Sequence, residues 1–354
     1  MSALELRPDL VELTGYHSAQ VEASVRLNTN ESPFEPPEAF IGELLEGVEA
    51  AHLNRYPDRE ALDLRSAIAS HAGVRVDEVF AANGSNEVLQ CLLLAYGGPG
   101  RRALVFEPTY TLHSHIARIT GTGVHVRRRD EDFRLSPGDV ASVVVELDPA
   151  IVFLCSPNNP TGIVEPIEVI EAALASSRGL VVVDEAYGQF ADSSAMSIRD
   201  LPGADRLVVI RTFSKTWAMA GVRLGYSVGS AEITRACFQV VLPYHLSSIT
   251  QLAGRLALRF DAEMQRNVAA VTEERGRLIT SLRELEVDVW PSSANFILFR
   301  PRSTDGHLVW ERLVERSVLI RDCSSWNGLE GCLRVTVGSA AENDAFIEAL
   351  EEIL

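Results

Sequence analysis

The chain has 354 residues, of which 46% are hydrophobic and 23% charged, and its formal net charge at pH 7 is -17. This length favours two unequal domains with a large core, and the excess of acidic residues argues against nucleic acid or an anionic membrane as a partner. We expect no secretory leader and no membrane span, because no apolar run is long enough. The five cysteines lack metal-ligand spacing, so we expect no metal site and a cytoplasmic location.

The first part of the chain has the pattern of an arm, a linker and two helices. Residues 1–30 form a mixed arm, and the proline-rich segment Ser32–Pro37 excludes a helix interior. Apolar spacing predicts helices over residues 38–50 and 60–71, with a loop at Asn54–Asp58 between them.

The middle of the chain alternates short apolar runs with helical stretches. Continuous Val, Ile and Leu runs are typical of strands buried on both faces, and their alternation with helices predicts a mostly parallel sheet. Each run ends in a polar cluster, and ligands of such sheets lie beyond the carboxyl ends of the strands. The expected strands are residues 79–82, 103–106, 151–154, 180–183 and 207–210.

The last third predicts a second, smaller α/β unit. Residues 231–285 are largely helical in pattern, followed by expected strands at 295–300 and 332–337 and a closing helix at 341–354. We therefore predict a large domain over residues 31–264, and a small domain made of residues 1–30 plus 265–354.

Lys215 is the only lysine in the sequence, and every other basic side chain except histidine is arginine. Arginine replaces lysine in most ion pairs, but a guanidinium is too basic to attack a carbonyl. A leftover surface lysine is the alternative. The neighbours favour chemistry, because Thr212, Ser214 and Arg223 are donors of the kind that hold a phosphate. An amine beside an anion site would capture a phosphorylated carbonyl cofactor, and pyridoxal phosphate fits.

Gly84-Ser85-Asn86 follows an expected strand and opens an expected helix, so its backbone N–H groups could bind an anion. The same sequence could be an ordinary helix cap.

Four further polar residues suit a bound pyridine ring. Asp184 ends an apolar run and is either a helix cap or the partner of a ring nitrogen. Tyr187 and Asn159 could donate to a ring hydroxyl, although Asn159 lies in a Pro-Asn-Asn-Pro-Thr-Gly segment that also suits a turn. Tyr110 could stack on the ring or be a core aromatic residue.

Arg334 stands among apolar residues in the expected strand at 332–337. It either faces solvent on the alternating side of the strand or is buried as a clamp for a carboxylate or phosphate.

Taken in this order, the motifs resemble those of the fold-type I pyridoxal-phosphate aminotransferases, and among them the histidinol-phosphate aminotransferase family. The resemblance extends from about Leu13 to Gly338. Besides the segments above, it is carried by Leu13–Ala19, Leu27–Glu31, Arg55–Pro57, Ala220–Tyr226 and Leu333–Gly338.

The resemblance implies a three-layer α/β fold with a mostly parallel sheet in the large domain and a smaller α/β domain. It implies that Lys215 is the Schiff-base lysine and that Asp184, Tyr187, Asn159 and Tyr110 surround the cofactor ring. The phosphate site would be built from Gly84, Ser85, Asn86, Thr212, Ser214 and Arg223.

The resemblance also implies a homodimer with shared active sites, because Tyr56 matches a tyrosine that reaches the phosphate from the neighbouring subunit. Arg334 matches the arginine for the substrate carboxylate, and Tyr16, Asn30 and Arg321 match substrate-pocket positions. The implied reaction is histidinol phosphate plus 2-oxoglutarate to imidazole-acetol phosphate plus glutamate.

Two departures from the family pattern bear on the substrate: Asn86 stands where aspartate is common, and Thr216-Trp217 follows the lysine where a smaller apolar pair is usual. Three alternatives stay open. They are an aminotransferase for aromatic amino acids, a lyase such as a threonine-phosphate decarboxylase, and a non-enzymatic regulatory module that binds pyridoxal phosphate.

Overall fold

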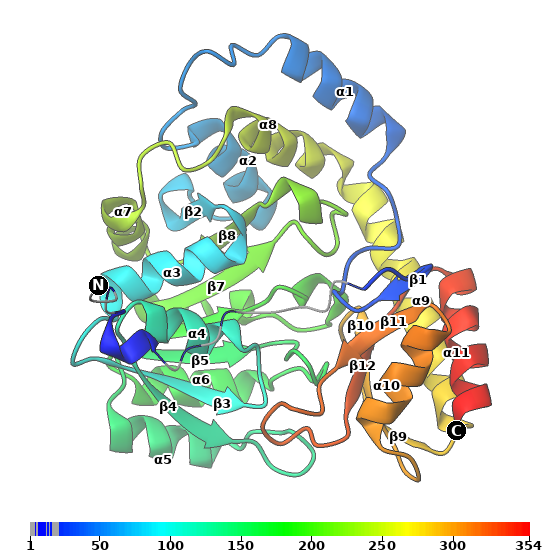
Figure 1. Cartoon of the computed structure of the whole chain (residues 1–354). Helices are drawn as coiled ribbons and strands as arrows, with labels where there is room; N and C mark the ends of the chain where they lie inside the picture. The colour runs from blue at the N-terminus through cyan, green and yellow to red at the C-terminus, as the bar shows by residue number, and fades with distance from the viewer. Residues whose placement is uncertain (1–3, 5, 12, 14, 16–20) are drawn as a thin grey trace.

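The computed structural model describes residues 4, 6–11, 13, 15 and 21–354. Two sheets organise this part of the chain, a larger one of seven strands and a smaller one of five. Figure 1 shows them side by side, with helices around each and the C-terminus beside the smaller sheet.

The large sheet has the strand order β2-β8-β7-β6-β5-β3-β4, and only β8 runs antiparallel to its neighbours. The carboxyl ends of the other six strands therefore lie along one edge, which is where the polar clusters of the sequence fall. The strands are β2 (Val79–Ala82), β3 (Arg102–Glu107), β4 (Gly123–Arg128), β5 (Ile151–Cys155), β6 (Leu180–Asp184), β7 (Leu207–Thr212) and β8 (Gly225–Val228).

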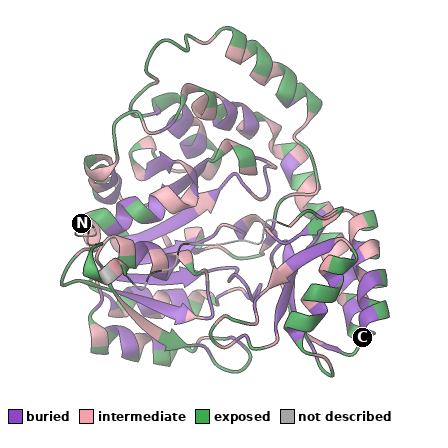
Figure 2. Cartoon of the chain, in the orientation of Figure 1, coloured by how far each residue is buried: buried purple, intermediate pink, exposed green. Residues whose placement is uncertain are grey.

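Helices cover both faces of this sheet, because alternate residues of each buried strand point to opposite sides. Phe80 and Ala82 pack in one apolar cluster with residues of α3, α4 and α7, whereas Val79 and Ala81 pack on the other face with residues of α2 and α8. Toward the far end of that second face, α5 and α6 cover β5 and β6. Figure 2 shows the resulting buried central layer. The helices are α2 (Leu62–Ala72), α3 (Gly84–Tyr96), α4 (Leu112–Ile119), α5 (Pro137–Leu147), α6 (Ile167–Ser176), α7 (Ala231–Val240) and α8 (Ser248–Ala257).

The small sheet has the order β1-β11-β12-β10-β9, with β1 parallel to β11 and the remaining pairs antiparallel. It brings residues near both ends of the chain together, because β1 comes from the N-terminal part. Its strands are β1 (Val25–Leu27), β9 (Val287–Val289), β10 (Phe296–Pro301), β11 (Val318–Asp322) and β12 (Leu333–Thr336). The remaining helices are α1 (Glu38–Glu49), α9 (Asp261–Arg283), α10 (Gly306–Glu315) and α11 (Ala340–Ile353).

The expected alternation of strands and helices is confirmed, and the differences are at element ends. Helix α3 begins at Gly84, so Gly84-Ser85-Asn86 forms its first turn. Helix α2 begins at Leu62 instead of about Glu60: Ala61 has φ 48°, and the Asp58 carboxylate accepts from the backbone N–H of Leu62 at 2.7 Å. The domain division at 31–264 stays a prediction.

Among the described residues, no helix is both long and apolar enough to cross a membrane.

Candidate active site

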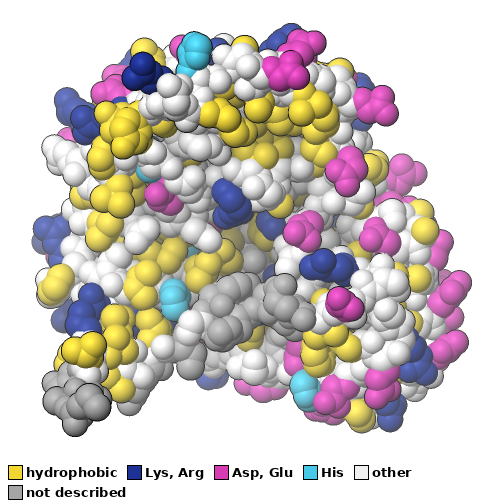
Figure 3. All heavy atoms as spheres, turned by 45° about the horizontal axis from the view of Figure 1, so that its top comes forward, with side chains coloured by type: hydrophobic (Ala, Val, Ile, Leu, Met, Phe, Trp, Pro, Cys, Tyr) yellow, Lys and Arg dark blue, Asp and Glu magenta, His cyan; other side chains and the backbone are white. Residues whose placement is uncertain are grey.

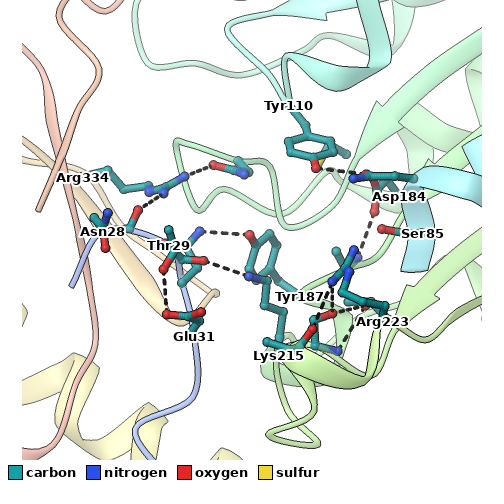
Figure 4. Close-up of a pocket in the computed structure, with 18 of the residues that line it drawn as sticks. Asn28, Thr29, Glu31, Ser85, Tyr110, Asp184, Tyr187, Lys215, Arg223 and Arg334 are labelled. Carbon is teal, nitrogen blue, oxygen red and sulfur yellow. Dashed lines mark hydrogen bonds between the residues drawn. The ribbon is translucent and has the colours of Figure 1, made fainter. Parts of the chain in front are cut away.

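A cavity of about 360 Å³ lies where the carboxyl ends of β5, β6 and β7 face β1 and β12 of the small sheet. Figure 4 shows the side chains that point into it from both sheets. The sequence-predicted residues that line it are Asn30, Ser85, Asn86, Tyr110, Asn159, Asp184, Tyr187, Thr212, Ser214, Lys215, Arg223 and Arg334.

Lys215 lies three residues beyond the end of β7, and its Nζ donates a hydrogen bond to the carbonyl of Thr29 at 3.0 Å. Burial lowers the pKa of Lys215 to about 7, and the positive charge of Arg334 acts in the same direction, while Glu31 opposes it. The amine can therefore be uncharged near neutral pH, which is the form that attacks a carbonyl or accepts a proton.

Asp184 ends β6 and is buried at the floor of the cavity, which it lines. Its Oδ2 lies 3.0 Å from Nε2 of His113, and its Oδ1 accepts from the backbone N–H of Ala186 at 3.1 Å. His113 is fully buried on α4 and stacks on Phe153 with ring centroids 4.9 Å apart. The carboxylate is thus held in one orientation, which is what a partner for a ring nitrogen requires. The cap interpretation is wrong, because the next helical turn, at Gly188–Phe190, is a 3-10 turn that has Tyr187 and not Asp184 at its N-cap.

The first turn of α3 and the loop after β7 form a cradle of anion donors. Gly84 has φ 76°, and a Cβ there would lie 2.6 Å from Nη2 of Arg223. A Cβ on Gly225 would clash with the backbone of Ser85. Arg223 Nη1 in turn donates to Ser214 Oγ at 3.3 Å. Glycine at both positions lets the backbone N–H groups of a helix N-terminus and a guanidinium converge, as a phosphate site needs.

Thr212 belongs to the same cradle as a support. Its Oγ1 accepts from the backbone N–H of Ser214 at 3.1 Å and lies 3.0 Å from Ser214 Oγ. It therefore orients Ser214.

Tyr187 is held by a residue that follows β1 and is itself bonded to β12. Nδ2 of Asn30 donates to its hydroxyl at 2.9 Å, and Asn30 Oδ1 accepts from Thr336 Oγ1 at 3.1 Å. Burial raises the pKa of Tyr187, although Arg334 and Asn30 act against the shift. The hydroxyl therefore stays a neutral donor at the pH of any physiological reaction.

Arg334 is buried, so the solvent-facing alternative is wrong. Its Nη1 donates to Asn159 Oδ1 at 2.5 Å and its Nη2 to the carbonyl of Asn28 at 2.8 Å. Its Nε is buried with no hydrogen-bond partner among the described residues. A buried guanidinium that lines a cavity in this way is suited to an incoming carboxylate.

Tyr110 and Asn86 are joined over the cavity, because the Tyr110 hydroxyl donates to Asn86 Oδ1 at 3.1 Å. Asn86 therefore orients the tyrosine at the position where the family often has aspartate. Trp217 does not enter the cavity. It is 7% exposed and packs in the core against Phe213 and His71, with centroids 5.4 and 5.6 Å away.

Three of the predicted site residues lie outside the cavity lining, and one lies outside the described residues. Gly84 shapes the cradle without facing the cavity. Tyr56 is on the outer surface, 81% exposed and stacked on Tyr244. Arg321 lies on β11 directly opposite Arg334, over the ring of Trp326. Tyr16 is the residue outside the described part of the chain.

Sequence reasoning did not single out His113 or the carbonyls of Asn28 and Thr29. His113 is one of eight histidines and lies three residues after Tyr110, a helical spacing that could have drawn attention to it. The two carbonyls carry no signal in the sequence, because any residue supplies the same backbone oxygen.

The residues present fit the expected pyridoxal phosphate. The glycine-lined cradle suits its phosphate, the neutral amine of Lys215 suits its aldehyde, and the oriented carboxylate of Asp184 suits its ring nitrogen. No group of three or more potential metal ligands occurs in the described part of the chain.

The comparisons with known proteins show the family to which the chain belongs. The family "Aminotransferase class I and II" matches residues 22–350, and the chain belongs to it. The chain is 43% identical over 361 residues to the histidinol-phosphate aminotransferase of Corynebacterium efficiens, with 100% of this chain and 96% of that protein covered.

Two solved structures confirm the expected fold-type I architecture. Histidinol-phosphate aminotransferase from Sinorhizobium meliloti, solved in complex with pyridoxal-5'-phosphate, has a TM-score of 0.89 at 21% identity and covers 100% of this chain and 99% of its own. L-threonine-O-3-phosphate decarboxylase from Porphyromonas gingivalis has a TM-score of 0.80 at 24% identity and covers 93% of this chain and 99% of its own. Because a decarboxylase has the same fold, the fold alone does not define the reaction.

Proposed function

We propose that this aminotransferase transfers the amino group between histidinol phosphate and 2-oxoglutarate, with imidazole-acetol phosphate and glutamate as the other pair and with pyridoxal phosphate as cofactor, in histidine biosynthesis. The observation that carries the reaction class is the sole lysine, Lys215, with its pKa lowered to about 7 in a cavity that also holds Asp184 and an anion cradle. The full-length likeness to a histidinol-phosphate aminotransferase supports the substrate.

In this proposal each residue has a separate task. The cofactor, when bound, supplies an aldehyde that takes up the amino group and a ring that withdraws electrons from the substrate Cα. Lys215 Nζ would remove the proton from Cα of the amino donor. In the second half of the reaction it would return a proton to Cα of the product. Asp184 holds a proton on the ring nitrogen, and Tyr187 donates to the ring hydroxyl.

The substrate ends would be bound by two arginines on adjacent strands. Arg321 and Arg334 are direct partners in the β11–β12 register, so their side chains leave the same face of the small sheet. Arg334 would hold the α-carboxylate of glutamate. Arg321 would pair with the phosphate of histidinol phosphate and with the side-chain carboxylate of glutamate, since a guanidinium fork accepts either.

A homodimer with shared sites is also part of the proposal. Tyr56 is exposed beside α8, whose Gln251 donates to the Asp58 carbonyl at 2.8 Å. Figure 3 shows hydrophobic side chains on this upper face. A second copy of the chain would cover this face and receive Tyr56 in its phosphate cradle. The exposed apolar residues on α1, α2, α8 and their loops are Ile41, Leu45, Leu53, Leu62, Leu242, Tyr244 and Ile249.

The proposed location is the cytoplasm. The five cysteines are all buried and none is in a disulfide, which suits a reducing compartment.

The test follows the visible absorption of the cofactor-loaded protein. Glutamate should abolish the original band, and imidazole-acetol phosphate, the oxo compound that corresponds to histidinol phosphate, should restore it. Lys215→Ala should retain the cofactor weakly and lose turnover. Turnover of phenylalanine equal to that of histidinol phosphate would replace the proposal with the aromatic aminotransferase, and release of carbon dioxide would replace it with the lyase. A cofactor band that none of these substrates changes would favour the non-enzymatic regulatory module.

A further inference from the structure

The loop between β11 and β12 carries a tryptophan that contacts Arg321. The Arg321 guanidinium carbon lies 5.5 Å from the centre of the Trp326 ring, within the range of a cation–π contact. Arg321 is the last-but-one residue of β11, and the loop closes by a hydrogen bond from Cys323 N to the Cys332 carbonyl at 3.1 Å. The contact is therefore local to one turn of the small domain.

The tryptophan is itself held in place. Its backbone N–H donates to the Cys323 carbonyl at 2.9 Å, and its carbonyl accepts from Leu329 N at 3.0 Å. Its ring packs on a small apolar cluster that includes Phe133 of the large domain and Leu298 of β10. The ring therefore has backbone hydrogen bonds on either side of it and an apolar cluster against it.

The next residue ties the loop to the large domain. Asn327 Oδ1 accepts from Arg128 Nη2 at 2.8 Å, and its Nδ2 donates to Glu107 Oε2 at 3.2 Å. Glu107 and Arg128 are register partners at the ends of β3 and β4, and Glu107 is three residues before Tyr110, which lines the cavity. The loop therefore joins β11 to β12 of the small sheet and is hydrogen-bonded through Asn327 to the ends of β3 and β4 of the large sheet. Trp326 is the residue before Asn327.

We propose that Trp326 is a positioning residue that sets the preference of the enzyme for a phosphorylated substrate, because its ring holds the Arg321 guanidinium where the substrate phosphate binds. This rests on the proposed function, in which Arg321 pairs with that phosphate. A guanidinium can stack through its flat face while its N–H groups, which lie in its plane, make a bidentate pair. Holding it before the substrate arrives removes part of the ordering cost of binding.

The chain offers a matched control. Trp290 packs on the same apolar cluster. Its ring centre, however, lies 5.5 Å from the guanidinium carbon of Arg300, which forms an ion pair with the partly exposed Asp288. Trp290→Leu removes an equal ring from the same cluster without touching Arg321.

The experiment measures kcat and KM separately for histidinol phosphate and for histidinol in the holoenzyme, and the preference is the ratio of the two kcat/KM values. Trp326→Leu should lower the preference roughly five- to thirtyfold, mainly through the KM for histidinol phosphate. Trp326→Phe keeps a ring with a weaker cation–π contact, so its preference should lie between those of the wild type and Trp326→Leu. Trp290→Leu should keep the wild-type preference. In an Arg321→Ala background, Trp326→Leu should change the preference no further.

The outcomes separate the two levels of inference. If Arg321→Ala erases the preference and Trp326→Leu leaves it at the wild-type value, the role of Trp326 is wrong and the proposed function stands. If Trp290→Leu lowers the preference as much as Trp326→Leu, the effect is general loosening of the cluster and the role of Trp326 is again wrong. If the wild-type enzyme shows no preference for phosphate, both the role of Trp326 and the phosphate role of Arg321 fall.

Discussion

Nε2 of His113 lies 3.0 Å from Oδ2 of Asp184, although the two residues are 71 positions apart in the sequence. Neither is more than 1% exposed. One comes from a helix on the face of the large sheet and the other from the end of its central strand β6. The pair fixes the direction of the carboxylate that faces the cavity, and two predictions follow from its geometry.

Replacing Asp184 by asparagine keeps the shape of the side chain and removes its charge. We expect kcat to fall by several orders of magnitude, equivalent to ~3–5 kcal/mol for a lost preorganised charge interaction. Steady-state kinetics on the cofactor-saturated variant measure this. An Asp184→Asn enzyme within a few-fold of wild type would show that the residue only shapes the turn before Ala186.

Replacing His113 by phenylalanine removes the nitrogen and keeps a flat ring against Phe153. We expect a smaller loss in kcat than for Asp184→Asn, on the scale of ~1.5–3 kcal/mol for a hydrogen bond to a charged group. The pH dependence of the cofactor absorption should shift as well, which a purely structural role would not cause. His115→Phe on the same helix is the control, and an equal effect there would contradict the specific role of His113.

The lowered pKa of Lys215 makes the stability of the cofactor-free protein depend on pH. The unfolded chain holds the lysine proton up to about the usual pKa of 10.5, whereas the folded chain releases it at about 7. Between these values the unfolded state binds more protons, so the free energy of unfolding rises with pH. Below pH 7 the folded state bears the full cost of charging the amine.

Lys215→Met removes this cost. We therefore expect the cofactor-free variant to be more stable than cofactor-free wild type at pH 6–7, and the difference to shrink toward pH 10. Urea unfolding at a series of pH values measures it, and all other groups cancel in the comparison. A difference that is constant with pH would mean that the amine keeps its ordinary pKa.

Tyr56 and Lys215 should complement each other between subunits. If the sites are shared, a hybrid dimer of Tyr56→Phe and Lys215→Ala chains has one site with both changes and one with neither. Mixing the two weak proteins under conditions of subunit exchange should then restore part of the activity. Sizing of the wild-type protein provides the parallel check, and a monomer, or no gain of activity on mixing, would speak against sharing.

The buried pair Glu185–Arg211 should be a determinant of stability. Glu185 is 1% exposed and accepts from Arg211 Nη2 at 2.9 Å and from Ala195 N at 2.6 Å. Arg211→Met leaves the carboxylate buried without its counter-ion, which costs about 3–5 kcal/mol. Chemical unfolding should show this loss, whereas Arg178→Met, which breaks the exposed pair with Asp148, should change little. Equal effects of the two changes would contradict the prediction.

The fold followed closely from local pattern. The apolar runs ending at Ala82, Asp184 and Thr212 are strands because side chains buried on both faces leave no polar position, and that signal survives without knowledge of the neighbours. Element ends were less predictable. The start of α2 depends on the positive φ of Ala61 and on the Asp58 carboxylate, which no apolar spacing reveals.

The candidate site divides in the same way. Lys215 stood out by composition alone, and the glycine-rich turn at Gly84 by its place between strand and helix. Arg334 had two possible environments, and only the fold of the small sheet, which brings the segment after β1 to the Arg334 side chain, decided that it is buried beside Asn28. His113 contacts Asp184, and Trp326 contacts Arg321, only because the folded chain brings each pair together.

The sequence by itself determined the alternating layers, the single amine and the residue types of an anion cradle, because these depend on which side chains occur and on their local spacing. Only the tertiary structure decided the protonation state of that amine, the orientation of Asp184 and the pairing of Arg321 with Trp326. Burial, the charges of Arg334 and Glu31, and contacts across strands from both ends of the chain set these properties. They are relations between atoms in space, and a linear order of residues does not contain them.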